Sequence, residues 1–331
     1  MKRVVALLAA ATCTAALAAC GGGAEPGAPK RATLVLDFAP NAVHTGIYAA
    51  LHQGYYEAAG IDLHVQQPSS STDAPKLLEA GRAQFAILDI HDLAIARERG
   101  FDLVGVAPVV QRPLASVIAR DAVRRPRDLE GRTVGVTGLP SDDAVLDSIV
   151  SADGGEPANV HRVTIGFNAV ASLAAGRVDA ATAFWNAEGV TLKRQGVATR
   201  TFRVDDYGAP RYPELVLVAT AGMVREDPNL VGAVVAATRG GYVIAERQPD
   251  EALDDLMEAD PSLDRADQAA ELRALNQAEA FRNAGEFDMA VLPAWARWEA
   301  VHGIVERPPD TRQMFVSPDQ LRAAGERAPS D

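Results

Sequence analysis

The stretch TLVLDFAPNAVHTGIYAALHQG, residues 33–54, indicates the fold class of this 331-residue chain. It begins with the apolar run Thr33–Leu36, which predicts a strand, and passes through a polar loop into a helical pattern, His44–Gln53, that ends at Gly54. A second run, Ile61–Gln66, predicts the next strand. A strand, a helix and a strand in this order are typical of a crossover unit, so the segment predicts an α/β fold.

The same order continues downstream. Asp73–Ala80 predicts a helix, and Phe85–Leu88 predicts a buried strand that leads into a helix over Asp89–Arg99. Leu114–Ala119 predicts a strand that leaves this group of elements. These residues therefore predict a first lobe with helices around a sheet.

A second group of elements begins with Asp128–Val136, whose last residues predict a strand. A turn at Gly138–Pro140 and a helix from Asp142 follow it, and Val160–Ile165 and Ala180–Phe184 predict further strands. The strand-loop-helix order is thus repeated, which predicts a second lobe.

The chain is long enough for two hydrophobic cores. Leu215–Ala219 predicts a strand that returns to the first lobe, and the remaining residues have mostly helical patterns. We therefore predict that residues 32–119 and 213–331 form lobe 1 and that residues 120–212 form lobe 2. Each lobe is expected to have a mainly parallel sheet flanked by helices, with a ligand cleft between the lobes.

The N-terminus has the order of an export signal: Lys2 and Arg3, an apolar run too short to cross a bilayer, and Leu17-Ala18-Ala19-Cys20. This tetrad resembles the lipobox of bacterial lipoproteins, in which the cysteine is acylated and becomes the N-terminus. The resemblance implies that residues 1–19 are a signal peptide, that Cys20 is lipidated on the extracytoplasmic face of the cell membrane, and that residues 20–31 are a flexible tether. A plain cleaved signal is the alternative, and it would leave Cys20 as a free thiol.

Composition excludes several classes of function. The two cysteines, Cys13 and Cys20, precede the folded body, which therefore has no disulfide, thiolate metal site or catalytic cysteine. The formal net charge is −12, which repels nucleic acid and anionic lipid headgroups. Lysine occurs at four positions, Lys2, Lys30, Lys76 and Lys193, which nearly excludes Schiff-base chemistry.

Two stretches carry a family resemblance. Residues 36–62 contain LDFAPN, HTG, GYY and GID, and residues 129–136 read LEGRTVGV. They resemble the NMT1/THI5-like family of periplasmic binding proteins, and within it the branch that binds pyrimidine precursors of thiamine. The resemblance extends from about Leu34 to Trp298. It implies a two-lobed periplasmic-binding-protein fold of type II.

The resemblance also implies a function. The protein is expected to be a monomeric lipoprotein, anchored to the membrane by its lipid, that delivers a solute to an ABC permease and its ATPase by hinge closure. We expect no catalysis, no cofactor and no nucleic-acid partner. The expected ligand is a small heteroaromatic molecule, an aminopyrimidine precursor of thiamine.

Polar and aromatic residues that follow the predicted strands are the candidates for the site, because ligands in open α/β sheets bind beyond the carboxyl ends of the strands. A flat heteroaromatic ligand needs a stacking face, which Trp185 offers, and a few directed hydrogen bonds. Glu188 and His91 also match family residues. The predicted ligand-binding residues are Asp37, Asn41, His44, Asp89, His91, Trp185, Asn186, Glu188 and Tyr207. The spacing of His44, Asp89 and His91 specifies no metal.

Two alternatives stay open. Relatives with this scaffold bind sulfonates, nitrate or riboflavin, and Arg112 and Ser141 are compatible with an anion. The family also includes a fungal synthase that makes the thiamine pyrimidine from pyridoxal phosphate and its own histidine. Its lysine lies where this chain reads Ile87-Leu88-Asp89, and its cysteine-rich iron motif has no counterpart in the body of this chain. Both departures argue against an enzyme.

Overall fold

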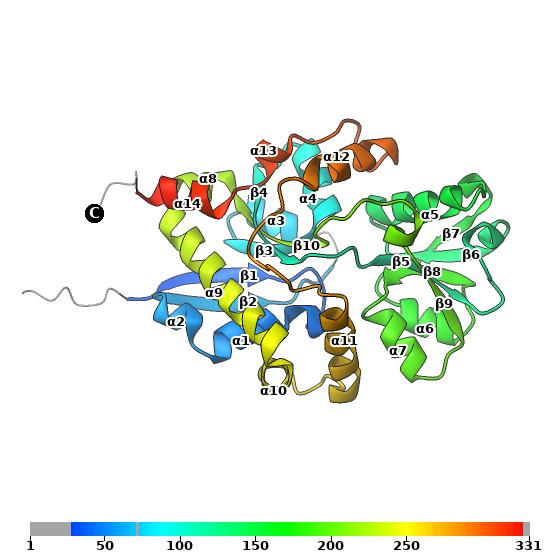
Figure 1. The fold of residues 1–331 in the computed structure, drawn as a ribbon, viewed down its shortest axis with the longest axis horizontal. Coiled ribbons are helices and arrows are strands. Elements are labelled where there is room, and N and C mark those ends of the chain that lie inside the picture. The colour runs from blue at the N-terminus through cyan, green and yellow to red at the C-terminus, as the bar shows by residue number, and fades with distance from the viewer. Residues whose placement is uncertain (1–27, 71–72, 327–331) are drawn as a thin grey trace, which may run out of the picture.

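Two five-stranded sheets, each with helices on both faces, form the two lobes of the protein (Figure 1). The computed structural model describes residues 28–70 and 73–326. The predicted signal peptide and Cys20 lie outside these residues. Within the described ranges, no helix has both the length and the apolar character needed to span a bilayer.

The first sheet has the strand order β2-β1-β3-β10-β4. Parallel pairing joins β1 to β2 and β3, whereas β10 runs antiparallel to β3 and β4. All eight residues of β4 are buried, as expected for a strand covered on both faces. The strands are β1 (Lys30–Val35), β2 (Ile61–Gln66), β3 (Phe85–Asp89), β4 (Leu103–Val110) and β10 (Leu215–Thr220).

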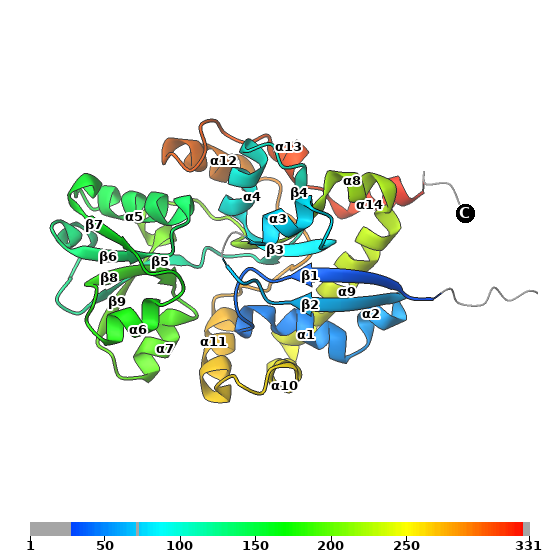
Figure 2. The ribbon, with the colours of Figure 1, turned by 180° about the vertical axis from the view of Figure 1, so that it is seen from behind.

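Helices cover both faces of this sheet, with α3, α4, α12 and α13 on one side and α1, α2, α10 and α11 on the other (Figures 1 and 2). The longest helix, α9, packs on α1 at Gly241, where a Cβ atom would lie 1.8 Å from the carbonyl oxygen of Gly46. Glycine is therefore required for this close approach. The helices are α1 (Thr45–His52), α2 (Tyr55–Ala58), α3 (Asp73–Glu79), α4 (Ile90–Glu98), α8 (Ala221–Glu226), α9 (Pro228–Arg247), α10 (Pro249–Ala259), α11 (Arg265–Gln277), α12 (Leu292–Val301), α13 (Thr311–Met314) and α14 (Pro318–Gly325), with the 3-10 helix η1 (Ala42–His44) before α1.

The second sheet has the strand order β7-β6-β8-β5-β9. Here β6 is parallel to β7 and β8, and β5 is antiparallel to β8 and β9. In Figure 1, α5 lies on one side of this sheet and α6 and α7 lie on the other. The elements are β5 (Ala115–Arg120), η2 (Pro126–Leu129), β6 (Thr133–Val136), α5 (Pro140–Ala152), η3 (Pro157–Asn159), β7 (His161–Thr164), α6 (Ala169–Ala174), β8 (Ala180–Phe184), α7 (Glu188–Arg194), β9 (Thr199–Arg203) and η4 (Val204–Tyr207).

In each sheet four strands run in one direction, as the prediction of a mainly parallel sheet requires. Each sheet is nevertheless mixed, because it also has one strand that runs antiparallel to both of its neighbours. These strands are β5 and β10, and the chain enters each of them from the other lobe. A strand that arrives from the opposite lobe runs in the reverse direction to strands that follow a local helix, so the antiparallel pairing follows from the two crossovers.

The position of the first crossover also differs from the prediction. The boundary after Ala119 assigned β5 to lobe 1, but β5 pairs with β8 and β9 in the second sheet. The chain therefore crosses between Val110 and Ala115. An apolar strand pattern shows that a strand is buried but not which sheet it joins, because pairing partners lie far away in the sequence. The return strand β10 begins at Leu215, two residues after the predicted boundary at residue 213.

Candidate ligand-binding cleft

A cavity of about 120 Å³ lies between the lobes, at the ends of strands from both sheets. The four loops that follow β1, β3, β6 and β8 contribute to its wall, as do residues after β2 and β7. The carboxyl ends of these strands therefore face a common space, as an open α/β sheet requires for ligand binding. Its polar, aromatic and proline lining residues are Asp37, Phe38, Asn41, Pro68, Ser70, Asp89, His91, Asp92, Ser116, Thr137, Ser141, Asp142, Phe167, Thr182, Phe184 and Glu188.

The loop after β1 places Asp37 and Asn41 at the cavity and His44 behind them. His44 is fully buried; its Nε2 donates to Asp37 Oδ1 at 2.8 Å, and its Nδ1 accepts the backbone N–H of Asn41 at 3.2 Å. These two bonds select one tautomer of the imidazole and orient the Asp37 carboxylate. The side chain of Asn41 caps η1 by accepting from the Val43 amide. His44 thus positions a cleft residue without lining the cleft.

Asp89 and His91 lie at the start of α4, where both line the cavity. The Asp89 carboxylate accepts the backbone N–H of His91 at 2.7 Å, which caps the helix. Burial raises the pKa of Asp89 well above its usual range, and the Glu214 carboxyl raises it further. Burial also raises the pKa of Glu214. The positive charge of His91 opposes both shifts, so burial is the main reason that these two carboxyls hold protons more readily than exposed ones.

His91 is held inside lobe 1 by two polar partners. Its Nδ1 is paired with Glu299, and its Nε2 lies 3.1 Å from the Tyr212 hydroxyl. Burial lowers the pKa of His91, but Glu299 and Asp89 outweigh burial and raise it to about 10. The ring is therefore an imidazolium at neutral pH and donates from both nitrogens.

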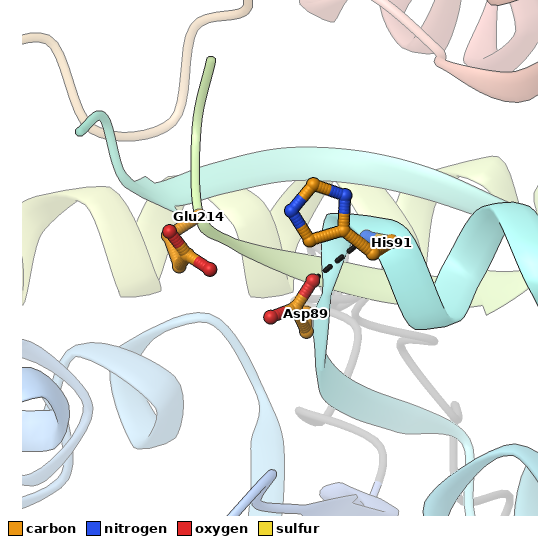
Figure 3. Close-up of side chains that lie close together, drawn as sticks. All are labelled: Asp89, His91 and Glu214. Atoms are coloured by element: carbon orange, nitrogen blue, oxygen red, sulfur yellow. Dashed lines mark hydrogen bonds between the residues drawn. The ribbon is translucent and has the colours of Figure 1, made fainter. Parts of the chain in front are cut away.

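The Asp89–Glu214–His91 cluster has the residue types of a metal site, since one ligand atom of each lies within 4.8 Å of the others (Figure 3). Both nitrogens of His91 already have partners, and an imidazolium has no free electron pair to offer a cation. We interpret the cluster as a hydrogen-bonded charge network.

On the other side of the cleft, Glu188 begins α7 and lines the cavity. Its carboxylate accepts the backbone N–H of Phe184 at 3.1 Å. Burial raises the pKa of Glu188, and Asp142 adds to this effect. Glu188 therefore holds a proton, and is neutral, more readily than an exposed glutamate.

Three other predicted residues lie elsewhere. Trp185 is at the crossover, where its indole N–H donates to the Pro113 carbonyl at 3.0 Å and the Arg203 guanidinium lies 4.4 Å from the ring centroid. Asn186 is fully buried, and in the described part of the chain neither polar atom of its side chain has a hydrogen-bond partner. Tyr207 packs edge-on against a neighbouring ring in lobe 2. None of the three lines the cavity.

The aromatic faces of the cleft come from residues that the sequence analysis did not select: Phe38, Phe167 and Phe184. Phe38 follows β1 and Phe167 follows β7, so they belong to different lobes. Their rings meet at a centroid distance of 4.4 Å and an angle of 79°. Their positions directly after predicted strands were the signal that could have identified them.

Asp92 and Asp142 also line the cavity and were not predicted, although each lies in the first turn of a helix that follows a predicted strand. Together with Asp37, Asp89 and Glu188 they make the cleft acidic. Among the described lining residues there is no lysine or arginine. A site of this composition accepts hydrogen bonds and is poorly suited to an anion.

Comparison with known proteins identifies the family. The sequence model described as NMT1/THI5 like matches residues 41–252, which is more than half of the chain. The chain belongs to the NMT1/THI5-like family. This result confirms the resemblance found in the two sequence stretches.

Of two curated relatives, one is named as a binding protein and the other as a synthase. The formylaminopyrimidine-binding protein of Halalkalibacterium halodurans is 37% identical over 227 residues, which cover 68% of this chain and 69% of that protein. The 4-amino-5-hydroxymethyl-2-methylpyrimidine phosphate synthase of Legionella pneumophila is 24% identical over 71% of this chain and 75% of that protein. The relatives of this chain therefore include one named as a binding protein and one named as a synthase.

Solved structures show the type II periplasmic-binding-protein fold. The alkanesulfonate-binding protein SsuA from Xanthomonas axonopodis pv. citri has a TM-score of 0.69 at 17% identity, covering 87% of this chain and 98% of that one. The nitrate-binding protein NrtA from Synechocystis PCC 6803 has a TM-score of 0.68 at 14% identity, covering 90% and 89%. At these identities the likeness concerns the fold alone, and it confirms the predicted two-lobed architecture.

Proposed function

We propose that this chain is the extracytoplasmic solute-binding protein of an ABC importer and that it binds an aminopyrimidine precursor of thiamine by closure of its lobes. The main support is the acidic, aromatic cleft between the two sheets, together with a 37% identical relative that is named for binding a formylaminopyrimidine. Ligands at such interlobe sites are enclosed by hinge motion.

Glu188 is the residue that we assign to the aminopyrimidine edge. An aminopyrimidine presents an exocyclic N–H donor beside a ring-nitrogen acceptor. A neutral carboxyl group presents the complementary pair, a carbonyl acceptor beside an O–H donor. The raised pKa of Glu188 favours this neutral form, and the rings of Phe38, Phe167 and Phe184 offer stacking faces.

The anion alternative has less support. Sulfonate and nitrate sites need cationic side chains or free backbone donors at helix starts. The starts of α4, α5 and α7 instead lie beside Asp89, Asp142 and Glu188, whose carboxylates accept nearby backbone N–H groups. These acidic side chains supply no positive charge at the three helix starts and accept backbone N–H groups that an anion would need.

The synthase alternative also has less support. Schiff-base formation with pyridoxal phosphate requires a lysine, and the described residues that line the cleft include none. Where the resemblance places the synthase lysine, Ile87 and Leu88 are buried in β3. A bound pyridoxal absorbance followed by pyrimidine formation would contradict our assignment as a binding protein.

We test the proposed ligand with the full chain by thermal unfolding against aminopyrimidines, riboflavin, taurine and nitrate. A ligand at 100 times its dissociation constant stabilises the folded state by roughly 2.7 kcal/mol, which raises the midpoint by several degrees. We expect an increase with aminopyrimidines, and a shift only with taurine or nitrate would contradict the proposal.

Replacing Glu188 should weaken aminopyrimidine binding strongly. Glu188→Ala removes both halves of the paired hydrogen bond, so we expect about a 100-fold loss of affinity by calorimetry, equivalent to about 2.7 kcal/mol. Glu188→Gln keeps an acceptor and should lose less. Asp62→Ala, on the exposed edge of β2, is the control. Unchanged affinity in both Glu188 variants would exclude this residue from the site.

We also propose that Cys20 anchors the protein to the membrane through a lipid. The basis is the Leu17–Cys20 tetrad after the apolar run. Cys20→Ser should release the protein from the membrane fraction and abolish labelling by a radioactive fatty acid. Labelling that persists in this variant would contradict lipidation at Cys20.

A further inference from the structure

The carboxyl groups that line the cleft differ in how well the protein itself satisfies them. Asp37 accepts from His44 at 2.8 Å, Asp89 accepts from the His91 amide at 2.7 Å, and Glu188 accepts from the Phe184 amide at 3.1 Å. The contact of Asp92 is weaker, because Ser141 Oγ lies 3.4 Å from its Oδ1. Among these carboxyl groups, Asp92 therefore has the weakest hydrogen bond and is the most available to accept one from a ligand.

Asp92 faces groups from both lobes. Asp89 and His91 of lobe 1 and Ser141 and Asp142 of lobe 2 line the same cavity, and Ser141 contacts Asp92 across it. His91 is the cation of this group, but it already forms an ion pair with Glu299. Burial raises the pKa of Asp92 well above its usual range, and Asp89 and Asp142 raise it further. The environment of Asp92 therefore has an excess of negative charge.

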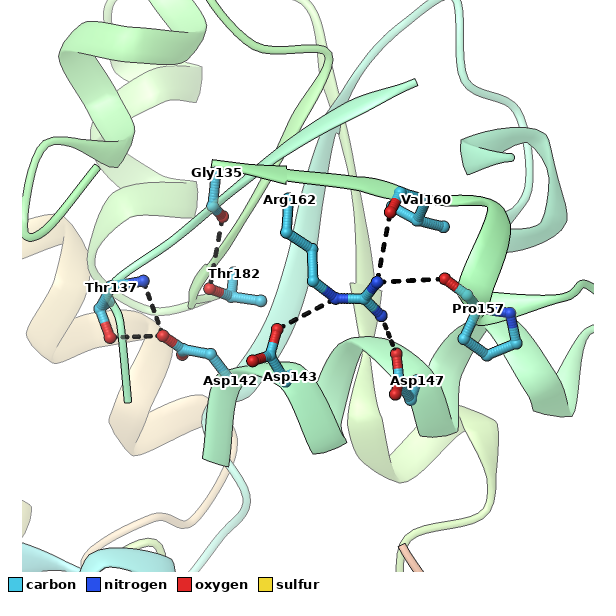
Figure 4. A network of polar contacts seen from close by, with 9 residues as sticks. All are labelled: Gly135, Thr137, Asp142, Asp143, Asp147, Pro157, Val160, Arg162 and Thr182. Carbon is cyan, nitrogen blue, oxygen red and sulfur yellow. Dashed lines mark hydrogen bonds and ion pairs between the residues drawn. The ribbon is translucent and has the colours of Figure 1, made fainter. Parts of the chain in front are cut away.

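Asp142 is likewise without a cation. Figure 4 shows that it points toward Thr137, whose backbone N–H donates to its carboxylate at 2.7 Å. The neighbouring Arg162 turns instead to Asp143, at 3.0 Å, and to Asp147. Because Arg162 already pairs with these two carboxylates, it does not neutralise the carboxyl group that Asp142 contributes to the cleft.

We infer that the ligand carries a protonated amine that binds between Asp92 of lobe 1 and Asp142 of lobe 2, while its aminopyrimidine edge binds Glu188. This inference rests on the proposed function and specifies the substrate class of the same site: a cationic aminoalkyl pyrimidine. Formylation would remove the charge from such an amine. The preferred ligand of this chain therefore differs from the formylated ligand named for its relative.

Binding of a cation at this position should change the number of protons bound to the cleft, and this change can be measured. Because the pKa of Asp92 is raised, its carboxyl holds a proton more readily than an exposed aspartate, and a cation bound beside it would lower that pKa again. Binding of the amine should release protons at neutral pH, and affinity for it should fall as the pH is lowered, because protons then compete for the carboxylates. A neutral ligand should show neither effect.

Calorimetry with three synthetic pyrimidines tests the inference. They are 4-amino-2-methylpyrimidines with an aminomethyl, a hydroxymethyl or a formylaminomethyl group at position 5. We expect the aminomethyl compound to bind at least about tenfold more tightly than either neutral compound, as a charge-assisted hydrogen bond requires. Its binding heat should vary between phosphate and Tris buffers, since protons are released to the buffer.

Variants separate the role of Asp92 from general effects. Asp92→Asn keeps the shape of the side chain and should remove the preference for the aminomethyl compound, so that the ratio of aminomethyl to hydroxymethyl affinity falls to about one. Asp102→Asn is the control, because Asp102 is an exposed residue paired with Arg225. If Asp92→Asn does not fold, the ligand series and the proton release in the wild-type protein still decide the question.

The possible results distinguish the two proposals. Equal affinity for all three pyrimidines, or tighter binding of the formylated compound, would overturn the inference of an amine and retain the proposed function. Failure of all three to bind would overturn the proposed function itself. Preference for the amine that persists in Asp92→Asn would also overturn the inference, because the charge would then be recognised elsewhere.

Discussion

Two of the contacts between the lobes differ in burial. At the crossovers, the fully buried carboxylate of Glu214 accepts the backbone N–H groups of Leu114 and Ala115, the latter at 3.2 Å, and so joins the two connecting segments. On the far side of the cleft, α7 of lobe 2 meets α11 of lobe 1. There Arg194, 40% exposed, forms an ion pair with Asp267. We call this second contact the α7–α11 latch.

This difference indicates how closure can work. Breaking the Glu214 contacts would leave buried amide groups without partners, which costs free energy in any conformation. When the latch opens, each charge of its exposed ion pair is solvated by water, so opening costs little free energy. We therefore expect the Glu214 contacts to persist through the opening motion and the latch to form only on closure. Glu188 lies on the same helix as Arg194, so ligand binding and latch formation involve one element.

The largest effect should come from Glu214. Glu214→Ala leaves the amides of Leu114 and Ala115 buried and unpaired, so we expect a loss of about 2–4 kcal/mol in the free energy of unfolding, measured with urea. Glu214→Gln keeps an acceptor and should lose less. The exposed Asp121→Ala is the control. A loss below about 0.5 kcal/mol in Glu214→Ala would remove the distinction between the two contacts.

A smaller effect should come from Glu271 of α11, whose carboxyl lies 3.5 Å from the Thr191 hydroxyl of α7 in the latch. Burial raises its pKa to about 8, and Glu188 and Asp267 add to this effect, whereas the Ala42 amide and the Thr191 hydroxyl oppose it. Because the folded state then keeps a proton that the unfolded state loses, stability should decline as the pH rises from about 4.5 to about 8.

Glu271→Gln tests this dependence. The amide does not ionise, so the variant should be more stable than the wild type at pH 9 by at least about 1 kcal/mol, with a smaller difference at pH 5. Thermal unfolding at the two pH values measures the difference. An unchanged pH slope in the variant would show that Glu271 is not the group that titrates.

The smallest effect should come from Arg194. Arg194→Ala removes an exposed ion pair, so we expect a change in unfolding free energy within about 0.5 kcal/mol and a two- to threefold loss of ligand affinity. Arg200→Ala, which breaks an exposed pair inside lobe 2, is the matched control and should not change affinity. An equal loss in both variants would contradict a role of the latch in closure.

Some of the residues predicted from the sequence to bind the ligand line the cleft, and others do not. The residues that line it follow strands that the apolar pattern of the sequence predicts. They are Asp37, Asn41, Asp89, His91 and Glu188. Trp185 also follows such a strand, but its indole turns to the Pro113 carbonyl. Sequence position determines which loop a residue occupies, whereas side-chain direction depends on partners from distant segments.

The sequence by itself determined the α/β class, the presence of two lobes, the family and the loops that form the cleft. These properties follow from local patterns: apolar periodicity, turn residues and short motifs. Only the tertiary structure decided that β5 belongs to lobe 2, that Phe38 meets Phe167, and that Asp92 and Asp142 line one cleft. Each of these depends on pairing between residues far apart in the chain, which is fixed by packing of the whole molecule and not by any local preference.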